Sequence, residues 1–194
     1  KEESVVKLIG AHILIAGLIS FITVLLLGPG TIRILHRLKF GQSIRTDGPQ
    51  SHQKKSGTPT MGGILIYLGI IAGVLAGAWG KMNSDLIWLL GITLGFGAIG
   101  LVDDMIIIIA KRSLGLKARQ KLLAQVILAG IFGMYVIHVN ALPSLLIPFS
   151  SINIPMTNAI LTFLFVVFTI VSETNAVNLT DGLDGLAAGT SVIA

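Results

Sequence analysis

The chain has 194 residues, of which 53% are hydrophobic and only 12% are charged, and it contains no cysteine. Soluble domains carry about 25% charged residues, so this chain has too little polar surface to face water on all sides. A disordered chain is excluded as well, because disorder requires low hydrophobicity. The composition predicts an all-α, polytopic transmembrane helix bundle, with residues 1–194 forming a single integral membrane domain.

Five stretches are apolar and nearly as long as a membrane span, which takes about 20 residues. In chain order they are Leu8–Leu27, Met61–Trp79, Leu86–Val102, Leu122–Val139 and Ala159–Val171, and a sixth begins at Leu186. Gly28-Pro29-Gly30 is expected to end the first span. The fifth is short unless the apolar residues 145–149 before it enter the interface.

The positive charges indicate the orientation of these spans. Six of the 14 Lys and Arg residues lie between the first and second spans, and five lie between the third and fourth. The positive-inside rule places both connections in the cytoplasm and the N-terminus outside. The net charge of +5 is therefore an orientation signal, and no nucleic-acid partner is expected.

Small residues recur at a spacing of four in two of the predicted spans. They are Gly69, Gly73 and Gly77 in the second span, and Gly91 and Gly95 in the third. Small residues at this spacing allow membrane helices to approach each other closely. The pattern predicts helix packing rather than a binding site.

Asp103 and Asp104 are expected to end the third span at the cytoplasmic surface. Adjacent carboxylates repel each other, a helix C-terminus disfavours negative charge, and ionisable groups are costly near the hydrocarbon. A Mg²⁺ ion would remove all three objections, since it is typically held by one or two carboxylates together with a substrate phosphate. The alternative is a pair of interfacial acids neutralised by Lys111 or Arg112.

Two further cytoplasmic segments are rich in polar residues. Residues 41–63 precede the second span and form either a solvated basic loop, with Thr58 or Thr60 as a helix cap, or a phosphate-binding site. Residues 175–185 contain two Asn, a Thr and two Asp, in either a helix or a loop. With the acidic pair, these segments favour metal-assisted phosphoryl transfer at the membrane surface.

Several of these segments together form a recognisable set of motifs. They are Gly41–Pro49, Lys55–Gly63, Val102–Asp104, Gly115–Leu122 and Asn175–Gly185. The set resembles the phospho-N-acetylmuramoyl-pentapeptide transferases. The resemblance implies a bacterial inner-membrane enzyme of about ten spans. The chain has no initiator Met, and we expect it to be the front part of such an enzyme, with a further Asp and a His cluster in the later half.

The resemblance also implies an activity at the cytoplasmic face. Phospho-MurNAc-pentapeptide would pass from UDP-MurNAc-pentapeptide to undecaprenyl phosphate with Mg²⁺ as cofactor, giving lipid I and UMP for peptidoglycan synthesis. A homodimer in the lipid bilayer is suggested by the same resemblance. The alternatives are a related polyprenyl-phosphate hexosamine-1-phosphate transferase and an inactive relative that binds lipid phosphate or nucleotide.

The motifs carry family roles over to individual residues. Asp103 and Asp104 match the acidic pair, which is implied to be catalytic and to hold the metal. The implied substrate-binding residues are His52, Lys55, Thr60, Asn175, Asn178, Asp181, Gly182, Leu183 and Asp184. Among them, Lys55 and residues 182–184 match the uracil end of the ligand, and Thr60, Asn178 and Asp181 match its ribose side. His52 and Asn175 match motif residues without an assigned role.

Two positions after the acidic pair depart from the family pattern. The family usually has a Tyr directly after the pair and a Lys three residues past its second Asp. Here these positions are Met105 and Ile107. If that Lys helps to hold the substrate phosphate, Ile107 removes its charge, which favours the inactive alternative.

Overall fold

The computed structural model describes residues 2–37, 61–110, 114–139, 144–147, 149–180 and 186–193. The chain forms two compact units, Lys1–Lys117 and Ala118–Ala194. Among the described residues, four helices are long and apolar enough to cross a membrane, and a fifth apolar helix is shorter. The predicted all-α membrane bundle is thereby confirmed.

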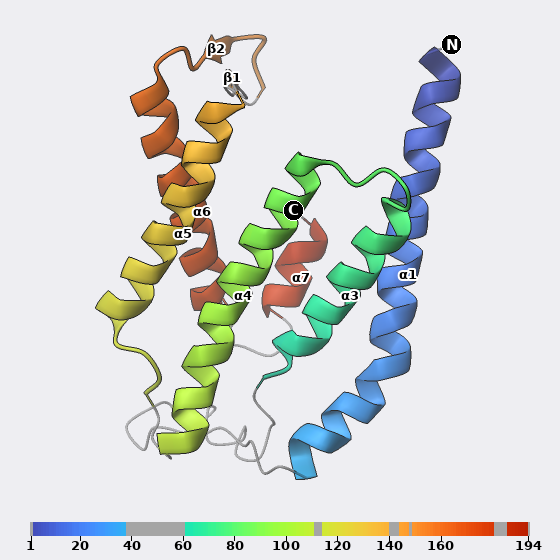
Figure 1. Ribbon diagram of the computed structural model, residues 1–194, viewed down its shortest axis with the longest axis vertical. Helices are drawn as coiled ribbons and strands as arrows, with labels where there is room; N and C mark the ends of the chain where they lie inside the picture. The colour runs from blue at the N-terminus through green and yellow to red at the C-terminus, as the bar shows by residue number, and fades with distance from the viewer. Residues whose placement is uncertain are drawn as a thin grey trace. The chain divides into compact units, whose positions relative to one another are not determined.

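The described part of the first unit contains two long helices and the shorter apolar helix (Figure 1). They are α1 (Glu2–Arg37), α3 (Gly63–Gly77) and α4 (Ser84–Ala110). The prediction that Gly28-Pro29-Gly30 ends the first span is wrong, because α1 continues through Pro29 to Arg37. Proline removes only one backbone donor, and membrane helices tolerate it at the expense of a bend. α1 bends in its C-terminal part (Figure 1).

The glycines of α3 are the contact surface between α3 and α1. A Cβ atom on Gly73 would lie 2.7 Å from the backbone oxygen of Ala16, and one on Gly77 would lie 2.7 Å from the Ala16 Cβ. A Cβ on Gly69 would lie 2.8 Å from Val24 Cγ2. These separations are too short for any side chain, so the predicted close packing is confirmed for this helix.

The contact of α3 with α4 includes Gly97, a glycine outside the predicted set. Gly91 has no atom of another residue within 4 Å of an added Cβ. The Tyr67 ring of α3 instead occupies the place that a Cβ on Gly97 would take. Gly91 therefore does not form this contact, whereas Gly97, which lies outside the spacing-of-four pattern, leaves room for the aromatic ring. The packing role expected of Gly95 stays a prediction.

α4 begins with a side-chain cap and runs past the expected end of the span. The Leu86 N–H donates to Asn83 Oδ1 at 2.9 Å, which satisfies one of the first backbone donors. The expected end at Val102 is wrong, since α4 continues for about two further turns to Ala110. The run Met-Ile-Ile-Ile-Ile-Ala contains no helix breaker, so Asp103 and Asp104 lie inside the helix rather than at its end.

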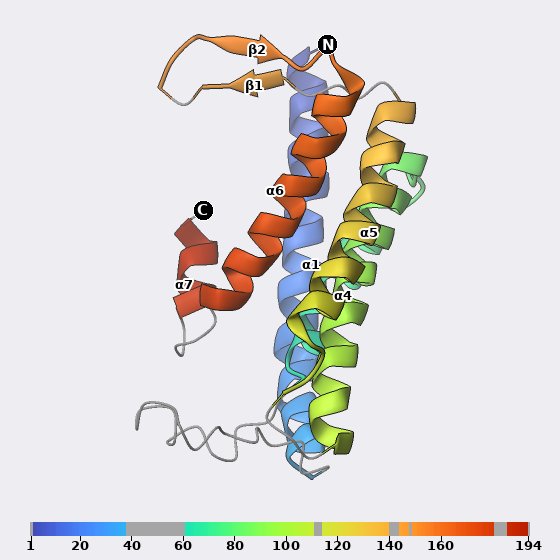
Figure 2. The ribbon, with the colours of Figure 1, turned by 90° about the vertical axis from the view of Figure 1, so that its left-hand side faces the viewer.

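The second unit pairs two antiparallel helices, α5 (Ala118–His138) and α6 (Ala159–Thr180), joined at one end by a short hairpin (Figure 2). The hairpin strands are β1 (Ser144–Leu146) and β2 (Asn153–Pro155), with Leu145 opposite Ile154. These strands were not expected from the sequence. A final helix, α7 (Leu186–Ile193), begins at the residue predicted for the sixth span.

α6 is longer than the predicted span Ala159–Val171, because it continues to Thr180. Its polar end remains helical since hydroxyl and amide groups donate to carbonyls of the preceding turn. Thr174 Oγ1 donates to the Ile170 oxygen at 2.7 Å, and Thr180 Oγ1 donates to the Ala176 oxygen at 2.8 Å. The motif residues 175–180 are therefore helical.

Candidate active site

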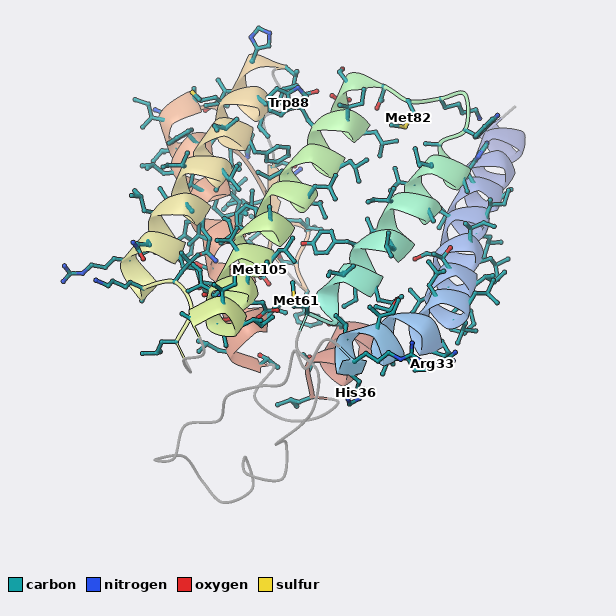
Figure 3. All side chains as sticks on the ribbon, turned by 60° about the horizontal axis from the view of Figure 1, so that its bottom comes forward. Arg33, His36, Met61, Met82, Trp88 and Met105 are labelled. Atoms are coloured by element: carbon teal, nitrogen blue, oxygen red, sulfur yellow. The ribbon has the colours of Figure 1, made fainter. Side chains whose placement is uncertain are left out.

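Asp104 of α4 contacts Met61, which lies two residues before α3. Its Oδ2 accepts a hydrogen bond from the Met61 N–H at 3.2 Å, across 43 positions of the chain. Met61 has a left-handed φ of 71° and is 7% exposed. Figure 3 shows Met61 beside the part of α4 that carries Met105. The end of the motif 55–63 thus meets the acidic pair.

This bond is made just before α3 begins. The N-cap of α3 is Gly62, which has no side-chain hydrogen bond, so neither Thr58 nor Thr60 occupies the cap position. Backbone N–H groups at a helix start attract negative charge. The Asp104 carboxylate of α4 therefore places a full negative charge beside the start of α3, where a Thr hydroxyl cap would have placed only a partial one.

Asp103 contacts the segment that precedes α5. Its Oδ1 accepts a hydrogen bond from the Leu116 N–H at 2.6 Å. Gly115 lies against the same residue: an added Cβ would collide with the carboxylate and would lie 2.7 Å from the Asp103 backbone oxygen. Only glycine fits this position, which explains the Gly at the start of the motif 115–122.

The two carboxylates are directed at different neighbours. Consecutive residues of a helix point about 100° apart, which lets Asp104 reach Met61 while Asp103 reaches Leu116. Both are half-buried in α4. Each is stabilised by a backbone N–H, and neither lies at the C-terminus of a helix, so two of the electrostatic objections to the pair are weaker than expected.

The polar residues of α6 meet α5 within the second unit. Asn175 Nδ2 donates to Gln125 Oε1 at 2.8 Å and to the Val171 backbone oxygen at 2.8 Å. One turn further along α6, Lys121 Nζ lies 3.5 Å from Asn178 Oδ1. The motif residues 115–122 and 175–178 are thus linked across the helix pair.

Lys121 and Gln125 are absent from the predicted site residues. The sequence predicts Lys121 as an orientation charge and as part of the motif Gly115–Leu122, without a role in the site. Gln125 had a usable signal, because it is the sole strongly polar side chain between Leu122 and Tyr135 in an otherwise apolar span. A polar side chain in a membrane helix usually has a partner on a neighbouring helix.

Seven predicted site residues lie outside the described part of the chain. They are His52, Lys55, Thr60, Asp181, Gly182, Leu183 and Asp184. Lys111 and Arg112, the alternative partners of the acidic pair, lie outside it as well. Within the described ranges, no group of three or more His, Cys, Asp or Glu side chains comes together to hold a metal. The described donor set is the Asp103–Asp104 pair.

Comparisons with known proteins agree with the motifs. Residues 86–194 match the model of glycosyl transferase family 4, and residues 55–66 match phospho-N-acetylmuramoyl-pentapeptide-transferase signature 1. Met61, which contacts Asp104, lies within that signature.

Similar full-length proteins carry the same name. The phospho-N-acetylmuramoyl-pentapeptide-transferase of Bacillus subtilis (strain 168) is 46% identical over 184 residues, which cover 94% of this chain and 56% of the relative. The protein of that name from Staphylococcus carnosus (strain TM300) is 46% identical over 186 residues, covering 94% and 57%. The chain thus spans about half the length of the curated relatives it matches.

The resemblance read from the motifs is confirmed by the signature and by these relatives. The apolar helices and the bacterial relatives indicate a multi-pass bacterial membrane protein. The family model covers more than half of the chain. The chain therefore belongs to glycosyl transferase family 4.

Proposed function

We propose that the whole protein transfers phospho-MurNAc-pentapeptide from UDP-MurNAc-pentapeptide to undecaprenyl phosphate. An oxygen of the lipid phosphate forms a bond to the sugar-bearing phosphorus, and the anhydride bond to the uridine phosphate breaks. The products are lipid I and UMP. The protein acts as a single integral membrane domain, a homodimer in the bacterial inner membrane, with its site facing the cytoplasm.

The contact between Asp104 and Met61 is the observation that best supports this proposal. It joins the acidic pair to the segment that matches the transferase signature, although the two are 43 positions apart. The bond from Leu116 to Asp103 adds a third motif within the same unit. Motifs that share one reaction are expected to share one location.

The acidic pair suits Mg²⁺ by the chemistry of its donors. Mg²⁺ prefers carboxylate oxygens and is commonly bound through one or two carboxylates together with substrate phosphates. Asp103 and Asp104 would hold it, and it would neutralise charge on the transferring phosphoryl group. The chain's own contribution is to fix both carboxylates, because each accepts a backbone hydrogen bond from a different segment.

We assign the remaining residues to substrate binding. Lys55 and residues 182–184 bind the uracil end, while Thr60, Asn178 and Asp181 bind the ribose side. The link from Lys121 to Asn178 supports a location near phosphate, since a lysine beside the motif adds a positive charge to it. His52 and Asn175 contribute to the same site.

UMP release from UDP-MurNAc-pentapeptide tests the proposal. The purified full-length protein should release UMP only when both undecaprenyl phosphate and Mg²⁺ are present. The matched comparison is UDP-N-acetylglucosamine, the donor of a related polyprenyl-phosphate transferase. UMP release from this second donor alone would replace the proposed substrate with a hexosamine.

Ile107 is the observation that favours binding without turnover. It lies in α4 one turn beyond Asp103, at a half-buried position where the family usually has a Lys. An apolar side chain supplies no charge to a phosphate there. If this alternative holds, the full-length protein binds the uridine donor and releases no UMP, and Ile107→Lys produces measurable UMP release.

A further inference from the structure

Gln125 is a deeply buried polar side chain that no motif includes. It is 2% exposed and lies in α5, opposite Asn175 of α6. Burying an amide among apolar side chains is costly unless it is hydrogen-bonded. Gln125 is bonded to a residue of the polar motif 175–185, which connects a helix interior to the proposed substrate site.

The orientation of both amide groups follows from one backbone carbonyl. The Val171 oxygen can only accept, so the Asn175 atom that lies 2.8 Å from it must be the nitrogen Nδ2. The same nitrogen lies 2.8 Å from the Gln125 side chain, which must therefore present its oxygen Oε1. Asn175 Nδ2 is thus held by two acceptors, the backbone oxygen of Val171 and Oε1 of Gln125.

This arrangement determines what Asn175 offers to a ligand. A side-chain amide nitrogen carries two hydrogens, and in Asn175 one is donated to Val171 and the other to Gln125. Asn175 Oδ1 is then the side-chain atom through which a ligand can be bound, and it accepts. A group with an N–H or O–H is therefore the matching ligand chemistry.

We propose that Gln125 is a positioning residue that holds Asn175 as a hydrogen-bond acceptor for an N–H or O–H of the uridine-linked substrate. This inference rests on the proposed function, because it needs residues 175–178 to face that substrate. Gln125 itself does not touch the substrate, since it is buried between the two helices. Its effect is on substrate affinity through the orientation of Asn175.

Two substitutions at Gln125 separate positioning from packing. Gln125→Met keeps the length of the side chain and removes one of the two acceptors of Asn175 Nδ2, so that only the Val171 oxygen still restrains the amide. Gln125→Glu keeps an oxygen opposite Asn175 Nδ2. A matched control is Thr162→Val: Thr162 is also fully buried in the same helix pair but lies about 20 Å from Asn175 along α6.

The test is the dissociation constant of UDP-MurNAc-pentapeptide for the full-length protein, measured calorimetrically without lipid phosphate. Variants are compared at equal amounts of protein that elutes as the wild type does in size exclusion. We expect Gln125→Met to weaken binding about tenfold, the effect of roughly one lost hydrogen bond. Gln125→Glu should restore most of the affinity, and Thr162→Val should bind as the wild type does.

The outcomes distinguish this inference from the proposed function. Wild-type affinity in Gln125→Met, or equal losses in the Met and Glu variants, would overturn the positioning role. A wild-type protein that does not bind the nucleotide would overturn both. If the binding series behaves as expected while the wild type releases no UMP with lipid phosphate and Mg²⁺, the positioning role is supported and only the transfer reaction is contradicted.

Discussion

Asp103 and Gly115 define the tightest contact around the acidic pair. The Leu116 N–H donates to Asp103 Oδ1, and this bond requires the backbone at Gly115 to approach the carboxylate more closely than a Cβ allows. Gly115 therefore affects the proposed phosphoryl transfer indirectly, because it allows the bond that positions the Asp103 carboxylate. Its contribution to helix packing is small, because it lies before α5 begins.

We expect Gly115→Ala to lower kcat for UMP release by about 10²-fold, since misplacing a reacting group by about 1 Å has an effect of this order. Gly100→Ala is the matched control. Gly100 lies in α4 like Asp103, and an added Cβ there meets no atom within 4 Å. Equal kcat values for the two variants would show that Asp103 tolerates the shift.

At the scale of single residues, the sequence predicts which residues belong to the site better than it predicts which residues they contact. The acidic pair could be found because carboxylates near hydrocarbon are rare and costly. The contacts of Asp104 with Met61 and of Gln125 with Asn175 could not, since each joins positions more than 40 residues apart. Such pairs depend on how helices pack, which hydropathy does not encode.

For the helices, hydropathy predicts how many there are, whereas local hydrogen bonds and apolar runs decide where they end. The number of apolar helices and the start of α6 at Ala159 agree with the prediction. The ends differ, because Thr and Asn side chains satisfy their own backbone at the end of α6 and because the apolar run after Asp104 extends α4. Hydropathy alone places a helix end where polarity rises, and here the helices continue past it.

The contact of α3 with α1 is the most extensive one between the described helices of the first unit, and Gly73 lies between Gly69 and Gly77 within it. We expect Gly73→Ala to destabilise the protein by about 1–3 kcal/mol, because the new Cβ would lie 2.7 Å from a backbone oxygen that cannot rotate away. Thermal unfolding in detergent measures this effect. Gly91→Ala, whose Cβ meets no atom within 4 Å, should leave the unfolding temperature unchanged; an equal loss in both variants would contradict the packing role.

For the whole molecule, the distribution of charge predicts how the chain crosses the membrane. Arg33 and His36 lie together at the C-terminal end of α1, whereas Met82 and Trp88 lie toward the other end of the first unit (Figure 3). In the second unit, the hairpin and the basic start of α5 lie at opposite ends of the helix pair (Figure 2). Within each unit taken by itself, these basic residues lie at one end of the helices, as the positive-inside rule expects.

Cysteine labelling tests this orientation directly, because the 194 residues contain no cysteine. Ser151→Cys, at an exposed position between the two strands, should react with a membrane-impermeant maleimide on intact spheroplasts. Arg119→Cys, at an exposed position in the first turn of α5, should react only after permeabilisation. The reverse pattern would place the acidic pair and its motifs outside the cell and contradict a cytoplasmic site.

We propose that Asp104 contributes its negative charge to phosphoryl transfer, in addition to accepting the hydrogen bond from the Met61 N–H. UMP release by full-length Asp104→Asn separates these two roles, because Asn keeps an oxygen for the Met61 N–H and loses the charge. We predict that kcat falls on the order of 10²–10³-fold while the unfolding temperature stays near that of the wild type. UMP release at the wild-type rate would contradict the claim and leave Asp104 with only the role of anchoring the segment before α3.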